Sequence, residues 1–163
     1  MSLSLKKASY RAAASLGAVQ SSGGASHAQQ IEPILTFPGT ARQAMEHYES
    51  VFGGTLTVNA FGDYGAPEGV DPNGVMHAML ETPSGFTIMA SDLPPGAEHK
   101  PGENIAVSLS GDDASELRGY WEKLSAGGTI TAPLEKQMWG DEFGMCADQF
   151  GIAWMVNISQ SGG

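Results

Sequence analysis

The stretch "GGTLT", residues 53–57, recurs almost unchanged as "GGTIT", residues 127–131, and this repetition decides the fold. Each copy follows a segment with the apolar spacing of a helix, and the two helical segments align at an offset of 73 residues. Glycine directly after the last apolar residue is typical of a helix C-terminus. Repetition of this kind indicates two copies of one supersecondary unit.

Both predicted helices carry a start signal and one apolar face. Thr40 is the expected N-cap of the first, with Gln43 three residues further on, and Asp113 with Glu116 has the same role in the second. Each helix is expected to pack one stripe on a sheet. The two stripes are Ala41, Ala44, Met45, Tyr48, Val51 and Phe52, and Ala114, Leu117, Trp121 and Leu124.

Strands are predicted around each helix in the same order. A short strand precedes it ("EPILTF", residues 32–37, and "ENIAVSLS", residues 103–110), and a strand beginning at Gly-Gly-Thr and then a hairpin follow it. Each half is therefore βαβββ, and the fold class is α+β. One helix cannot cover both faces of a sheet. The two modules are expected to form a cupped eight-stranded mixed sheet around a shared cleft, with the helices on the outer face.

The expected domain covers residues 31–159, with module one at 31–92, a linker at 93–103 and module two at 104–159. Residues 1–30 are rich in Ser, Ala and Gly and are predicted to be a flexible or arm-like leader. A secretory signal is the alternative, because a charged start precedes "AAASLGAV", but this apolar stretch is short and interrupted.

Alternation along the hairpin strands separates a core face from a cleft face. In the first module the helix side is predicted to hold Phe86, Ile88 and Ala90. In the second it is predicted to hold the matching residues Ile152, Trp154 and Val156, together with Ile105, Val107 and Leu109 on the strand before the helix. The cleft side is predicted to hold Thr87, Met89, Ser91, Asn104, Ala106, Ser108, Ala153, Met155 and Asn157. This row is neutral and contains methionine, which suits an organic molecule better than a bare cation.

Composition excludes several classes of function. A net charge of −10 and a pI near 4.6 argue against binding to nucleic acid or to an anionic membrane surface. No apolar run approaches the length of a membrane span. The single cysteine, Cys146, forms no intrachain disulfide and fits a reducing, cytoplasmic location.

Six residues are predicted to contact a ligand: His77, Met89, Asn104, Trp139, Phe143 and Met155. His77 has the residue type of a general base or a metal ligand, but a strand histidine bonded to backbone or buried in an interface is the more common situation. Trp139 and Phe143 either stack on a planar ligand or pack the two halves together. No catalytic residue is assigned.

Three segments in this order, "ARQAMEHYESVFGG", "MHAML" and "WGDEFGMCADQFGIAWMVN", give the chain a resemblance to the vicinal-oxygen-chelate superfamily of glyoxalases, bleomycin-resistance proteins and dioxygenases, and within it to the PhnB-like branch. The resemblance implies two βαβββ modules, usually a homodimer, and a cup used for metal-assisted chemistry or for ligand sequestration. Demethylubiquinone methyltransferase activity, a label sometimes attached to this branch, is not predicted, because no glycine-rich nucleotide-binding turn is present.

The superfamily's four metal-ligand positions fall near Pro33, Met89, Asn104 and Met155. None of these side chains suits a hard or borderline divalent cation. The sequence therefore predicts a protein that binds a small organic ligand without the usual metal site and without a cofactor. One alternative is a divergent lyase, isomerase or dioxygenase of the same superfamily. It would either depend on a metal bound through Glu32, His77 or Glu103 or use His77 as a base without a metal. The other alternative is an interaction scaffold whose cleft is filled by its own side chains.

Overall fold

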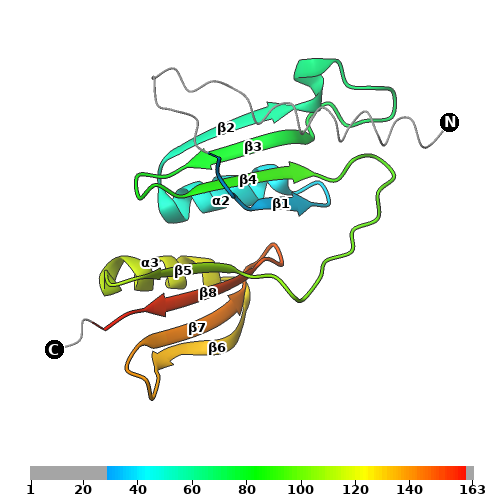
Figure 1. Cartoon of the computed structure of the whole chain (residues 1–163). Helices are drawn as coiled ribbons and strands as arrows, with labels where there is room; N and C mark the ends of the chain where they lie inside the picture. Colours follow the sequence, from blue (N-terminus) through cyan, green and yellow to red (C-terminus); the bar gives the residue numbers. More distant parts are fainter. Residues whose placement is uncertain (1–28, 161–163) are drawn as a thin grey trace. The chain divides into compact units, whose positions relative to one another are not determined.

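The computed structural model describes residues 29–160, so most of the predicted leader lies outside the described residues (Figure 1). The elements follow in the order β1 (Ile34–Phe37), α2 (Ala41–Phe52), β2 (Thr55–Ala60), the 3-10 helix η1 (Phe61–Tyr64), β3 (Val75–Glu81), β4 (Thr87–Asp92), β5 (Val107–Gly111), α3 (Ala114–Ser125), β6 (Thr129–Lys136), β7 (Glu142–Ala147) and β8 (Ala153–Ile158). The chain divides into two compact units between His99 and Lys100, except that Ser50–Phe52 at the end of α2 group with the second unit. The elements before and after this division each follow the order βαβββ. The fold class is α+β, as predicted.

The eight strands form two four-stranded sheets with the same order. The first is β1-β4-β3-β2 and the second β5-β8-β7-β6. In each sheet the first strand of the module runs parallel to the last, and the other pairs are antiparallel. The sequence repeat is therefore a repeat of topology and register.

Close backbone contact explains why Gly-Gly recurs. A Cβ atom on Gly54 would lie 2.2 Å from the carbonyl oxygen of Glu81, and one on Gly128 would lie 2.1 Å from that of Ala147. The preceding residue, Gly53 or Gly127, has a positive φ near 70°. Both positions in each pair thus favour glycine, one because of its φ and the other because it lies against the neighbouring strand.

The first helix begins where expected, with Thr40 at the N-cap position, but the side chain of Thr40 does not cap the helix. Thr40 has φ −114° and ψ 13°, outside the extended conformation of an N-cap, and its side chain makes no capping hydrogen bond. The carboxylate of Asp92 at the end of β4 instead accepts a hydrogen bond from the N–H of Ala41 at 2.9 Å. The predicted stripe is buried along the whole helix.

The second helix matches its prediction at the start. The side chain of Asp113 accepts a hydrogen bond from the N–H of Glu116 at 3.0 Å, and Leu117, Tyr120, Trp121 and Leu124 form its buried face. On the sheets, Ile88, Ala90, Trp154 and Val156 are buried as predicted, whereas Phe86 lies in the turn before β4 and is exposed.

Strand β5 is shorter than predicted. Ile105, assigned to the core, is 80% exposed, and Asn104 and Ala106 precede the strand. The parallel register pairs Val107 with Trp154, the second residue of β8. Residues before Val107 therefore have almost no strand beside them, because the chain before β8 forms the Asp148–Gly151 turn.

Candidate functional site

In the first unit, β3 and β4 present polar and sulfur-containing side chains on the face opposite the buried one. Met79 on β3 lies directly across from Met89 on β4, and His77 shares the face of Met79 two residues earlier. His77 in turn pairs with Asn59 on β2. The two methionines are half-buried. Two of the six predicted ligand residues, His77 and Met89, thus lie on one face of one sheet.

His77 is 6% exposed, and burial lowers the pKa of its imidazole because the charged form loses hydration. The ring is therefore neutral near pH 7. A neutral imidazole can accept a proton or bind a metal ion through its unprotonated nitrogen.

The second unit repeats this arrangement with one difference. Met145 on β7 lies across from Met155 on β8, at the same 66-residue offset from Met79 and Met89. Phe143 occupies the position that corresponds to His77, and it pairs with Asn157. The Asn157 amide donates a hydrogen bond to the carboxylate of Asp141 at 3.0 Å. Phe143 and Met155, two further predicted ligand residues, share this face.

The remaining two predicted residues lie outside the strands. Trp139 is 63% exposed in the β6–β7 turn, and Asn104 is exposed in the irregular stretch before β5. Neither belongs to the methionine-bearing face of its sheet.

The donor set at the four superfamily metal positions does not fit a divalent cation. Met89 and Met155 offer thioethers, Asn104 is outside its strand, and the backbone carbonyl of Pro33 accepts a hydrogen bond from the N–H of Met89 at 3.1 Å. Among residues 29–160, no three His, Cys, Asp or Glu side chains form a group that could hold a metal ion. The alternative ligands, Glu32 and Glu103, both lie outside the strands; Glu32 is half-buried and Glu103 is exposed.

Cys146 and Asp148 have structural roles. The Cys146 thiol is buried, and desolvation together with the charge of Asp148 raises its pKa to about 11. Asp148 holds its turn by accepting hydrogen bonds from the N–H groups of Phe150 and Ile152, and it accepts a third from the indole of Trp154 at 2.8 Å. A thiol that stays protonated at neutral pH is a poor nucleophile.

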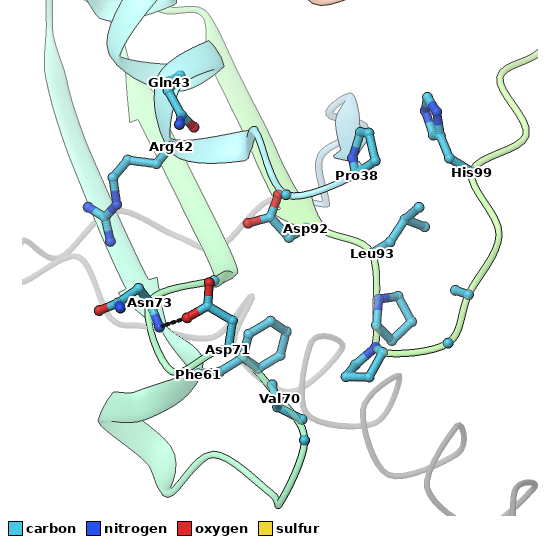
Figure 2. A pocket seen from close by; sticks show the side chains of 17 residues that line it. Pro38, Arg42, Gln43, Phe61, Val70, Asp71, Asn73, Asp92, Leu93 and His99 are labelled. Carbon is cyan, nitrogen blue, oxygen red and sulfur yellow. Dashed lines mark hydrogen bonds between the residues drawn. The ribbon is translucent and has the colours of Figure 1, made fainter.

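A cavity of about 570 Å³ lies elsewhere in the first unit, at the N-terminal end of α2 (Figure 2). Its walls come from the start of α2, the β2–β3 connection and the segment that follows β4. None of the six predicted ligand residues lines it, although His99 does.

Asp92 lines this cavity and is a buried charged residue that the sequence analysis did not single out. It is 8% exposed, and its two carboxylate oxygens accept hydrogen bonds from the N–H groups of Ala41 and Val75 at 2.9 and 2.8 Å. A signal was present in the sequence, since Ile88, Ala90 and Asp92 share one strand parity and a charged residue on the core-facing side needs buried partners.

Comparison with known proteins is consistent with the class that this architecture defines. A glyoxalase/bleomycin resistance protein/dioxygenase domain from Frankia has the same fold, with a TM-score of 0.58 and 16% identity over 83% of this chain and 96% of that one. The chain therefore has the fold of the glyoxalase, bleomycin-resistance and dioxygenase superfamily.

Within that superfamily, residues 29–157 match the family model described as 3-demethylubiquinone-9 3-methyltransferase, and the chain belongs to this family, the PhnB-like branch. The protein PA1353 from Pseudomonas aeruginosa is 38% identical, with a TM-score of 0.73 over 82% of this chain and all of that one. A putative 3-demethylubiquinone-9 3-methyltransferase, PhnB protein, from Bacillus cereus shares the fold, with 23% identity and a TM-score of 0.64 over 80% of this chain and all of that one.

Proposed function

We propose that the protein binds a small organic molecule through the methionine-bearing sheet faces and that binding needs no divalent metal. The observation that carries this proposal is the repeated cross-strand pair, Met79 with Met89 and Met145 with Met155. In both modules the pair occupies the same place on the face opposite the buried core.

Methionine suits such a role for physical reasons. Its side chain is unbranched, flexible and polarizable, so a pair can adapt to the shape of an apolar or aromatic ligand and make favourable sulfur–aromatic contacts. The neighbouring strand residues Asn59, His77, Phe143 and Asn157 add one aromatic ring and a few hydrogen-bonding groups that can orient the ligand. A mostly apolar surface with few polar groups is typical of small-molecule sites.

The experiment is a thermal-shift screen with a library of uncharged aromatic and heteroaromatic compounds. Compounds that raise the melting temperature are then titrated against two double variants, Met79→Ala/Met89→Ala and Met145→Ala/Met155→Ala. Met138→Ala is the matched control, because Met138 is fully exposed in the β6–β7 turn. We expect weaker binding in at least one double variant and unchanged binding in the control.

Elemental analysis of the purified protein tests the metal part of the proposal. Zinc, nickel, manganese and iron(II) are then added while the melting temperature is followed. A stoichiometric metal, or a metal-dependent stabilisation that His77→Ala abolishes, would favour the divergent metal-dependent lyase, isomerase or dioxygenase instead.

A further inference from the structure

We propose that the cavity at the N-terminal end of α2 is a second binding site, separate from the methionine-bearing faces, for an organic molecule with an apolar or aromatic body and a single negative charge. A volume of about 570 Å³ lies within the range of small-molecule sites. The proposal rests on the composition of the cavity and on lining residues that the two otherwise repeated modules do not share.

The apolar part of the cavity comes from two segments that face each other across it (Figure 2). Phe61 and Val70 belong to the β2–β3 connection, and Leu93, Pro94 and Pro95 follow β4. The N–H of Leu93 donates to the carbonyl of Phe37 at 2.8 Å. This hydrogen bond fixes the start of the segment Leu93–Pro95 to the end of β1. These side chains can enclose a ring or a short aliphatic body.

The β2–β3 connection is held in shape by its own hydrogen bonds. The N–H of Phe61 donates to the carbonyl of Gly74 at 2.9 Å, and that of Gly62 donates to the carbonyl of Pro72 at 2.8 Å. A Cβ on Gly74 would lie 3.2 Å from the Phe61 ring, so the ring packs closely on this glycine. The aromatic wall is therefore preorganised, which lowers the entropic cost of binding.

Arg42 supplies the charge that selects an anion. Its side chain extends from α2 over one end of the cavity (Figure 2), and no carboxylate of residues 29–160 lies within ion-pair distance of its guanidinium. By contrast, Arg118 in the second unit is bound to Glu142. An arginine that is not already paired can form charge-assisted hydrogen bonds to an incoming carboxylate or sulfonate.

Two carboxylates also line the cavity, and they limit the ligand to one negative charge. Both oxygens of Asp92 are already engaged by backbone N–H groups. Asp71 lines the cavity, is exposed, and accepts a hydrogen bond from the N–H of Asn73 at 2.9 Å. A second negative group on the ligand would meet the Asp71 charge.

Within residues 100–160, the second module differs from the first at three features that build this cavity. Its β6–β7 connection is the short turn 137–141, whereas the β2–β3 connection spans residues 61–74. At the matching offsets, Ser115 stands in place of Arg42 and the buried Ile158 in place of Asp92. The scaffold alone therefore does not require these residues, and a long ordered connection is often functional.

Binding of anilinonaphthalene sulfonate, followed by its fluorescence, tests the proposal, with uncharged phenylnaphthylamine as the matched probe. We expect Arg42→Gln to weaken sulfonate binding about tenfold or more and to leave phenylnaphthylamine binding unchanged. Phe61→Ala should weaken both probes, and Val70→Ser is the second wall variant if Phe61→Ala does not fold. Arg118→Gln should change neither.

Equal sulfonate affinity in the wild type and Arg42→Gln would overturn the proposal. So would loss of sulfonate binding in Met79→Ala/Met89→Ala with full binding in the wall variants, because the probe would then occupy the methionine-bearing face. Failure of the organic-ligand screen on the methionine variants leaves this result unaffected, so the two proposals can fail separately.

Discussion

The Oδ1 atom of Asp92 lies 2.9 Å from the backbone nitrogen of Ala41, and this hydrogen bond ties the end of β4 to the start of α2. The other carboxylate oxygen ties the same residue to the first N–H of β3. One buried side chain thus joins three elements of the first unit beneath its cavity.

Asp92→Asn should lower the free energy of unfolding by about 2 kcal/mol, because an amide can accept only one of the two hydrogen bonds and places its NH₂ against the other N–H. Urea unfolding followed by circular dichroism measures the change. Asp71→Asn is the control, since Asp71 is exposed and bonds only within its turn, and it should change stability by less than about 0.5 kcal/mol. Equal effects of the two substitutions would contradict the role of Asp92.

Cys146 should make stability pH-dependent under alkaline conditions. Burial, with a contribution from Asp148, raises its pKa from 9.0 to about 11, so the folded state holds the thiol proton more tightly than the unfolded chain does. The stabilisation is complete below pH 9 and is lost as the pH rises from 9 to 11. Urea unfolding followed by tryptophan fluorescence should show this loss in the wild type and not in Cys146→Ala. An equal dependence of stability on pH in the wild type and in Cys146→Ala would contradict this role of Cys146.

His77 should make stability pH-dependent under mildly acidic conditions. Burial lowers its pKa below 6.5, so the unfolded chain binds a proton that the folded state does not bind. The contribution of neutral His77 to the free energy of unfolding is complete above pH 6.5 and is lost as the pH falls through the folded-state pKa. His77→Phe, which introduces the residue found at the matching position of module two, should flatten the melting temperature between pH 5 and pH 7. His99→Gln, in the exposed segment after β4, should behave like the wild type.

A homodimer is expected, because strands at sheet edges expose apolar side chains. Ile34 on β1 and Ile130 on β6 are each 51% exposed, and both strands are at the edge of their sheets. An exposed edge strand offers unpaired backbone N–H and C=O groups with which another chain can pair. Light scattering should give twice the chain mass of 17.0 kDa, and Ile34→Lys or Ile130→Lys should lower it. A mass of 17.0 kDa for the wild type would contradict the dimer.

Local pattern predicted most of the fold. The helix stripes, the glycine pairs and the alternation of Ile88, Met89 and Ala90 depend on periodicity and on close backbone contact, and both can be read over a few residues. The error at Ile105 has a different origin. The length of a parallel strand depends on where its partner begins, and that partner, β8, lies about fifty residues further along the chain.

The cavity could not be predicted for a similar reason. Its walls depend on hydrogen bonds that close the β2–β3 connection, such as that from Phe61 to Gly74, and on Leu93 pairing with Phe37. No short sequence pattern specifies these contacts. In the sequence, Arg42 is one of several polar residues on a helix, and only the folded β2–β3 connection brings it to a cavity.

Methyl NMR of the protein labelled at its methionine methyl groups tests the central claim most directly. Compounds selected from the uncharged aromatic library are added, and the eight methionine signals, assigned by single substitution, are followed. We expect the signals of Met79 and Met89, or of Met145 and Met155, to shift with saturation while that of Met138 stays fixed. Binding that shifts none of these four signals would show that the methionine-bearing faces are not the ligand site.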